Sequence, residues 1–149
     1  MKRKRSAAIG AIVLAASAGL AATAALAADR VAAAVDCKAA TGAFVYDCTI
    51  KLSNARTSAP LEQASLSVGA DMPSMPMAHN VRPVIAKATG RPGEYQARIT
   101  LEMHGDWAVR LRIGGPLKDQ LVQMRSFDDK GSGPPRRKAG APGGGGHKH

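Results

Sequence analysis

One stretch of the sequence decides the fold class: Phe44-Val45-Tyr46-Asp47-Cys48-Thr49-Ile50-Lys51-Leu52. Every second side chain, from Phe44 to Leu52, is apolar or aromatic or is Cys48, and the side chains between them are mostly polar. Because successive side chains of a β-strand point to opposite faces of the sheet, this alternation predicts a strand with one buried face. Cys48 falls on that face, which indicates a structural position.

Similar patterns recur along the central part of the chain. Strict alternation continues in Ala64–Ala70, Tyr95–Met103 and Trp107–Ile113, and shorter β-rich runs occupy Val81–Ala88 and Leu121–Met124. Asp29–Ala34 is a candidate first strand, although its alanines are also compatible with a helix. Turn signals separate these runs at Gly90-Arg91-Pro92-Gly93, Gly105-Asp106 and Gly114-Gly115-Pro116. Six or seven short strands in about 100 residues predict an all-β fold, an immunoglobulin-like β-sandwich.

The two ends of the chain differ from this central region. Residues 1–27 combine basic Lys2–Arg5, an uncharged Ala-rich run and Ala25-Leu26-Ala27, which is typical of a secretory signal cleaved before Ala28. The alternative is an uncleaved anchor in the inner membrane, and both place the domain outside the cytoplasm, in the periplasm or secreted. Residues 128–149 form a basic Gly/Pro-rich tail that we expect to be disordered. The predicted domain therefore spans residues 28–127, and in the tail His147 and His149 are either solvated or weak metal ligands.

The composition excludes several classes of function. The net charge of +10 is concentrated at the two ends, and only five residues are aromatic, which is too few for stacking platforms that read nucleic-acid bases. The sequence shows no paired carboxylates, no Ser/His/Asp arrangement and no Gly-rich loop between a strand and a helix. We therefore expect no enzymatic activity, no small-molecule substrate and no nucleic-acid partner.

Cys37 and Cys48 are the only cysteines of the chain. An even number in an exported protein indicates a disulfide, which for a loop of this size stabilises by about 3 kcal/mol. The alternative is a redox or thiolate metal pair, but the spacing is not that of the reactive C-x-x-C motif.

Methionine and histidine are concentrated in two short segments, Met72-Pro73-Ser74-Met75-Pro76-Met77-Ala78-His79 and Met103-His104. The two prolines favour an extended backbone, in which Met75, Met77 and His79 point the same way. If the hairpin around Gly90–Gly93 continues outward in register, His79 faces His104 and Asn80 faces Met103. Converging thioether and imidazole groups form a soft site that suits Cu(I). The predicted ligands are Met75, Met77, His79 and Met103, with Met72 and His104 as alternates.

Two other interpretations of these segments remain open. Met72, Met75 and Met77 could plug the open end of the sandwich, and His104 could simply begin the turn at Gly105-Asp106. Glu102, the only acid near both histidines, falls on the opposite strand face from Met103, so we expect it to be solvated.

At these residues the chain resembles the YtkA-like/FixH-like family of small exported or membrane-anchored domains. The resemblance is carried by three motifs in order: Met72-Pro73-Ser74-Met75-Pro76-Met77, Pro92-Gly93-Glu94-Tyr95 and Leu101-Glu102-Met103-His104-Gly105-Asp106-Trp107. It covers Leu61–Ile113 and implies an immunoglobulin-like sandwich with a role near copper handling or respiratory oxidase assembly. Tyr95 and Trp107 then belong to the framework, with shielding of a copper site as an alternative role for Trp107.

Two functions follow as hypotheses. The first is an exported copper-binding protein that delivers the ion to a copper acceptor by ligand exchange. The second is a metal-free adaptor module that docks on a membrane or efflux complex through the methionine segment.

Overall fold

The computed structural model describes residues 28–76 and 78–136. These residues form nine strands and no helix: β1 (Val31–Ala39), β2 (Val45–Asn54), β3 (Ser65–Asp71), β4 (Asn80–Ile85), β5 (Lys87–Ala88), β6 (Glu94–Thr100), β7 (Gly105–Gly114), β8 (Asp119–Phe127) and β9 (Ser132–Gly133). The described part of the chain accordingly offers no helix able to serve as a membrane span. The predicted signal, residues 1–27, and residues 137–149 of the predicted tail lie outside the described residues.

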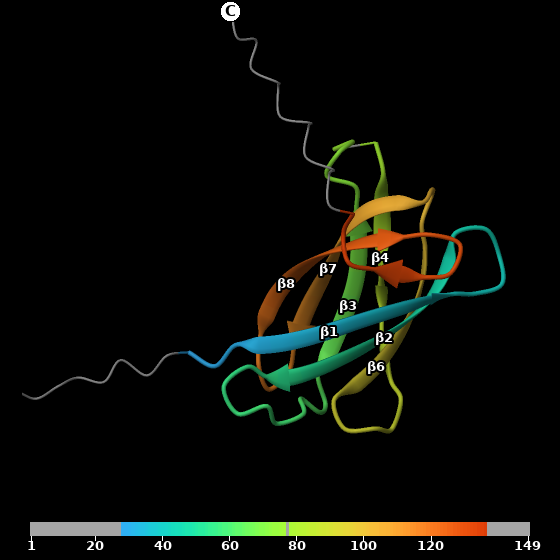
Figure 1. Cartoon of the computed structure of the whole chain (residues 1–149). Helices are drawn as coiled ribbons and strands as arrows, with labels where there is room; N and C mark the ends of the chain where they lie inside the picture. The colour runs from blue at the N-terminus through green and yellow to red at the C-terminus, as the bar shows by residue number, and fades with distance from the viewer. Residues whose placement is uncertain (1–27, 77, 137–149) are drawn as a thin grey trace, which may run out of the picture.

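The strands form two antiparallel sheets packed face to face (Figure 1). One sheet has the order β1-β2-β6-β5 and the other has the order β4-β3-β7-β8-β9. Strands β1 to β8 correspond in chain order to strands A, B, C, C′, D, E, F and G of an immunoglobulin domain, which form the sheets A-B-E-D and C′-C-F-G. β9 is an additional edge strand beside β8. The predicted all-β sandwich is therefore confirmed, with nine strands rather than six or seven.

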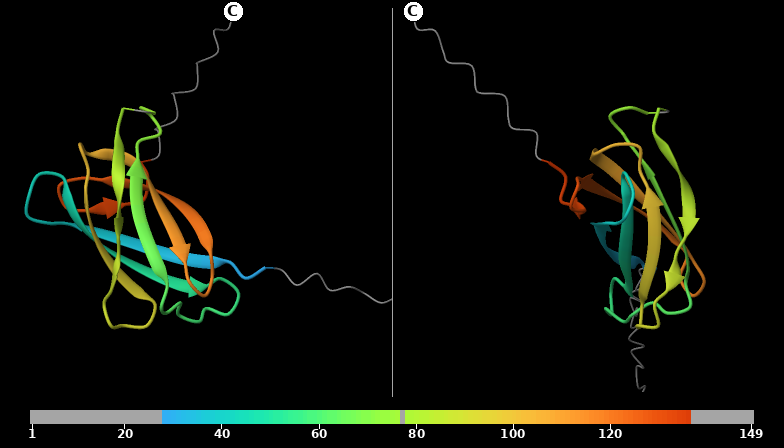
Figure 2. Two further views of the ribbon diagram at one scale, coloured as in Figure 1. Left: turned by 180° about the vertical axis from the view of Figure 1, so that it is seen from behind. Right: turned by 90° about the vertical axis from the view of Figure 1, so that its right-hand side faces the viewer.

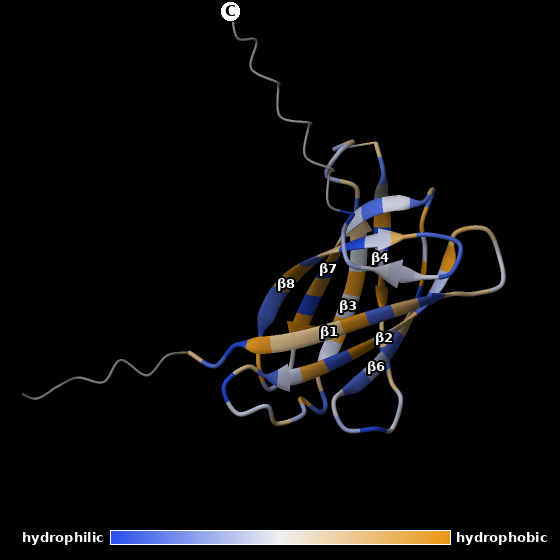
Figure 3. Ribbon diagram, viewed as in Figure 1, coloured by the Kyte–Doolittle hydropathy of each residue, from blue (hydrophilic) through white to orange (hydrophobic). Residues whose placement is uncertain are grey.

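The core lies between the sheets and follows the predicted alternation. On β2 the inward residues Tyr46, Cys48, Ile50 and Leu52 are all buried, and β6 and β7 show the same pattern. Figure 3 shows hydrophobic and hydrophilic residues alternating along these strands. Trp107 is completely buried and is the largest such side chain of the described part.

The predicted disulfide joins Cys37 and Cys48, which face each other directly across β1 and β2. Both cysteines are buried, and their Cα atoms are 3.9 Å apart. The bond therefore links neighbouring strands of one sheet, unlike the bond between sheets in antibody domains. The first strand is longer than predicted, because β1 continues past Ala34 to include Cys37.

The predicted run Val81–Ala88 is not one strand but two. β5 pairs with β6 in the predicted hairpin register, with Lys87 opposite Gln96 and Ala88 opposite Tyr95. β4 instead pairs with β3 in the other sheet, and the chain crosses between the sheets at Ala86 (Figure 2). A bulge interrupts the β3–β4 ladder where Pro83, which has no backbone N–H to donate, lies opposite Gly69.

Backbone pairing continues past Phe127, the last residue of the domain predicted from the sequence. β9 pairs with β8, and Gly131 forms a bridge with Lys38 on β1. The Tyr46 hydroxyl donates a hydrogen bond to the Asp128 carbonyl at 2.8 Å. Burial raises the pKa of Tyr46, so its phenol keeps the proton that this bond requires. The hydrophobic pattern ends at Phe127, but backbone pairing holds the next six residues in place.

Candidate metal centre

The predicted ligands lie on two connections at one end of the sandwich. The β3–β4 connection spans residues 72–79, and the β6–β7 connection spans residues 101–104. Figures 1 and 2 show both at the same end, opposite the end that carries the β5–β6 turn. The two methionine-bearing segments therefore meet, as the sequence predicts.

The β3–β4 connection consists of turns and is not extended. The Met75 amide donates to the Met72 carbonyl at 3.0 Å, and the Ala78 amide donates to the Met75 carbonyl at 3.2 Å. Pro73 and Pro76 each follow the first residue of such a turn, the position where the fixed φ of proline is favoured. The prediction of an extended segment was wrong, so a shared direction of Met75, Met77 and His79 does not follow. Met77 lies outside the described residues.

Met72 differs from the other methionines of the site. Its side chain is only 4% exposed and belongs to the core cluster between the sheets. Its Cε atom lies beside Gly105, where an added Cβ would be 3.3 Å away. This position favours a packing role for Met72 over a role as a metal ligand. The buried side chain anchors the β3–β4 connection on the core.

Met75 and Met103 are exposed, at 38% and 36%. The backbone of Met103 is held in place because its carbonyl accepts a hydrogen bond of 3.2 Å from Nε1 of buried Trp107. Each connection thus presents one accessible thioether next to a buried anchor, Met72 for the first and Trp107 for the second.

His79 closes the β3–β4 connection and reaches the β6–β7 connection. Its Nδ1 atom is in hydrogen-bond contact with a carboxylate oxygen of Glu102, and the ring lies edge-on to Trp107 with centroids 6.4 Å apart. The expectation that Glu102 is only solvated was therefore wrong. A proton held on Nδ1 by the carboxylate leaves the lone pair of Nε2 available, which is how a histidine is commonly prepared to bind a metal.

His104 does not face His79. Its ring packs edge-on against Phe44, with centroids 4.9 Å apart and an interplanar angle of 81°. Phe44 has the left-handed φ of 57° and its carbonyl accepts a hydrogen bond of 2.9 Å from the Leu101 amide. The predicted pairing of His79 with His104, and of Asn80 with Met103, was wrong because β4 leaves β6 to pair with β3, placing Asn80 opposite Asp71.

The donor set that remains is soft. Within residues 28–76 and 78–136, no group of three or more His, Cys, Asp or Glu side chains is arranged to hold a metal ion. The exposed thioethers on the two connections, among the described residues, are those of Met75 and Met103. His79 lies on the same connection as Met75 and contacts Glu102 on the connection that carries Met103. Thioether and imidazole donors favour copper over zinc or calcium.

The YtkA-like family model matches residues 33–112, which is more than half of the chain. The chain belongs to the YtkA-like family. The match begins within β1 and ends within β7, so both connections of this YtkA-like domain lie inside it. No curated protein and no solved structure matches the chain.

The framework residues implied by the family resemblance occupy structural positions in this YtkA-like domain. Tyr95 is buried, and its hydroxyl donates to the Leu61 carbonyl and accepts from the Ala64 amide, both at 2.9 Å. These bonds tie β6 to the segment that leads into β3. Trp107 combines a framework position with contact to the His79 ring, so the two roles considered for it do not exclude each other.

Proposed function

We propose that this YtkA-like protein is an exported, non-enzymatic copper-binding protein that delivers Cu(I) to an acceptor protein. The proposed ligands are His79 through Nε2 and the thioethers of Met75 and Met103. Met77 is a further ligand in the proposal on sequence grounds alone. Residues 1–27 act as the export signal in this proposal.

The observation that carries the proposal is the contact between His79 Nδ1 and Glu102. A carboxylate that accepts the Nδ1 proton fixes the tautomer and the orientation of the ring, and it leaves Nε2 as the atom that can bind a metal. Glu102 is exposed for half of its side chain, so the contact is made although water could solvate the carboxylate instead.

The position of the thioethers suits release as well as binding. Met75 lies at the junction of two turns on an exposed connection, and Met103 lies on the facing connection. Ligands of this kind can be replaced one at a time by those of an approaching acceptor, because both methionines are exposed. Cu(I) supplies a soft, singly charged centre that thioethers bind without first losing a proton.

The test is an anaerobic Cu(I) titration of the full chain against a chromophoric chelator. To remove the tail histidines from the result, the titration uses a chain with His147→Asn and His149→Asn. The proposal expects one tightly held Cu(I) per chain. Met75→Ala combined with Met103→Ala should weaken binding by at least about tenfold, because two of the soft ligands are lost.

A matched control is Met124→Ala, which removes a methionine of similar exposure from β8, a strand that flanks neither connection. Cu(I) affinity should be unchanged in this variant. Glu102→Gln should weaken binding by about 10- to 100-fold without changing the number of ions bound, since it removes only the partner of His79. Unchanged affinity in the Met75/Met103 double variant would refute the assignment of the ligands.

A further inference from the structure

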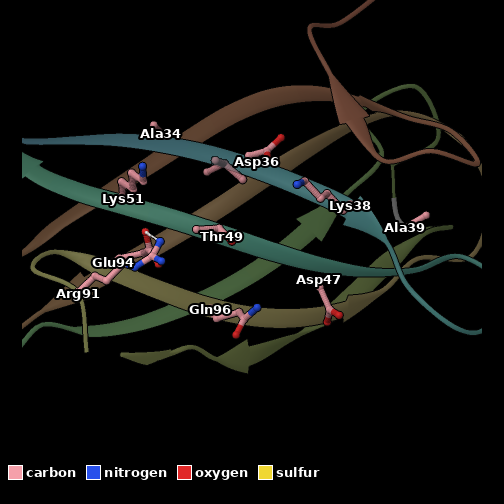
Figure 4. A pocket seen from close by; sticks show the side chains of 11 residues that line it. Ala34, Asp36, Lys38, Ala39, Asp47, Thr49, Lys51, Arg91, Glu94 and Gln96 are labelled. Carbon is pink, nitrogen blue, oxygen red and sulfur yellow. Dashed lines mark ion pairs between the residues drawn. The ribbon is translucent and has the colours of Figure 1, made fainter. Parts of the chain in front are cut away.

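The two sheets present outer faces of different character. The outer face of the β1-β2-β6-β5 sheet carries an open hollow of about 610 Å³, lined by side chains of both charges (Figure 4). Acidic and basic side chains line it in equal number: Asp36, Asp47, Glu94, Lys38, Lys51 and Arg91. Two ion pairs lie on this face, Arg98 with Asp47 at 2.7 Å and Arg91 with Glu94 at 3.8 Å. Because the two signs balance, this face gives no indication of the charge of a partner.

The outer face of the other sheet is basic and partly apolar. Arg110 and Arg112 project from β7, and exposed Arg82 lies on β4. Arg110 pairs with Asp71 at 2.6 Å, whereas Arg112 and Arg82 take part in none of the ion pairs found among the described residues. Three of the five exposed large apolar side chains of the described part also lie on this sheet: Ile85, Val122 and Met124.

Strand register places these groups next to one another. Arg110 lies between Gly69 on β3 and Val122 on β8, and the neighbouring row places Arg112 between Ser67 and Gln120. Ile85 pairs with Ser67 and is 74% exposed. The centre of this surface is a hollow of about 360 Å³ between Pro83 and the two arginines, in which Asp71 is the only carboxylate among the described lining residues.

Gly69 forms part of this hollow although the fold does not require a glycine there. Its φ is not in the left-handed region, and an added Cβ would make an ordinary contact of 3.4 Å with Pro83. Glycine inside a strand weakens the strand, and it is found at bulges, as in the β3–β4 ladder here, and where another backbone approaches closely. The missing side chain leaves room for an extended segment to pass over β3 at this point.

We propose that this surface, defined by Ser67, Gly69, Pro83, Arg110, Arg112 and Val122, binds an extended acidic segment of a partner protein. Its carboxylates pair with Arg112 and Arg110, and its backbone passes over Gly69. Apolar side chains of the segment lie against Val122 on one side and Ile85 on the other. A second copy of the chain does not fit, because the same face would bring arginine against arginine.

The probe is a short fluorescein-labelled peptide of alternating glutamate and leucine, and its binding to the full chain is followed by fluorescence polarisation. The proposal expects saturable binding that weakens with salt, and no binding of the same peptide with glutamine in place of glutamate. Arg112→Glu should weaken binding by at least about tenfold. Gly69→Ala should weaken it by about threefold or more, with a urea unfolding midpoint no lower than that of the unmodified chain.

The matched control is Lys51→Glu, which makes the same change of charge on the exposed outer face of β2. It should leave affinity for the peptide within about twofold, because Lys51 lies on the opposite side of the sandwich. An equal loss in Lys51→Glu and Arg112→Glu would overturn the proposal, since only net charge would then matter. Failure of the peptide to bind would also overturn it, as would vesicles of phosphatidylglycerol binding in an Arg112-dependent way while the peptide does not. None of these measurements involves copper, so they are independent of the proposed metal site.

Discussion

The β2-β6 pair and the β3–β4 connection belong to the same sandwich but are held in place by different means. The two strands are aligned over seven residue pairs, and every inward side chain of β2 is buried. The connection is held by two proline turns, by buried Met72 and by the contact between His79 and Glu102. The β2-β6 pair is therefore fixed by strand pairing over a long stretch. The β3–β4 connection is fixed at a few points only, which leaves the Met75 thioether accessible.

Trp107 is the point where the two parts join, so its removal should have the largest effect. The ring is completely buried, and Nε1 holds the Met103 carbonyl at 3.2 Å. Trp107→Ala should lower the free energy of unfolding by about 3–5 kcal/mol, because it leaves a large cavity and an unpaired carbonyl. Urea unfolding followed by circular dichroism measures this loss. A loss under about 1 kcal/mol would show that the connections are not supported from the core.

Met72 and Met75 allow a buried side chain and an exposed one to be compared within the β3–β4 connection. Met72→Ala should lower the free energy of unfolding by about 2–3 kcal/mol, since the side chain is buried in the core. Met75→Ala should change it by less than about 0.5 kcal/mol, because Met75 is exposed and its turn bonds involve only backbone atoms. The same urea experiment compares the two, and equal losses would contradict the distinction between anchor and exposed donor.

Substitutions at Gly131 and Gly133 test how firmly residues 128–133, which include β9, are attached to the sandwich. A Cβ added at Gly131, where φ is +153°, would lie 2.3 Å from the Cys37 carbonyl oxygen, whereas one added at Gly133 would meet no atom within 4 Å. Gly131→Ala should therefore cost about 1–3 kcal/mol in unfolding free energy through displacement of β9 from β1. Gly133→Ala should be close to neutral in the same measurement. If both are neutral, β9 is not tied to the disulfide-bonded strand.

Much of the framework could be predicted from the sequence, because alternation carries direct information about burial. Tyr46, Cys48 and Ile50 were assigned to the buried face correctly, and the disulfide was predicted correctly from the presence of two cysteines in a chain with a predicted export signal. The register of β5 with β6 was also predicted correctly, since the turn at Gly90–Gly93 fixes it locally.

For the candidate metal site, the sequence predicted that the two methionine-bearing segments meet, but not how their side chains are arranged. Val81–Ala88 could pair with β3 in one sheet or with β6 in the other, and its pattern of side chains is compatible with both. The sequence therefore did not predict that the chain crosses between the sheets at Ala86. The role of Glu102 was missed because the alternating pattern continues to Met103, whereas β6 ends at Thr100. Beyond a strand's end the period of two no longer says where a side chain points. The proline spacing from Pro73 to Pro76 was the available signal for two consecutive turns.

The smallest expected effect concerns Asp119, whose carboxylate holds the start of β1 as Glu102 holds His79. It accepts hydrogen bonds from the Val31 amide at 3.0 Å, the Gln120 amide at 2.9 Å and Arg30 Nε at 3.1 Å. The bond from the Val31 amide, followed by those from Gln120 and Arg30, lowers the pKa of Asp119 in the folded protein. Its stabilising contribution is therefore complete above the unfolded pKa of about 4 and is lost as the pH falls through the folded pKa.

Asp119→Asn should consequently flatten the fall in unfolding free energy between about pH 5 and pH 2, compared with the unmodified chain. Urea unfolding at a series of pH values measures this slope. Asp36→Asn serves as the control, because Asp36 is exposed on β1 and its carboxylate accepts none of the side-chain hydrogen bonds found among the described residues. Equal slopes in the Asp119→Asn variant and the unmodified chain would mean that the start of β1 is held by its ladder with β2 alone. In that case Asp119 would not stabilise the framework in the way that Glu102 holds His79 in the β3–β4 connection.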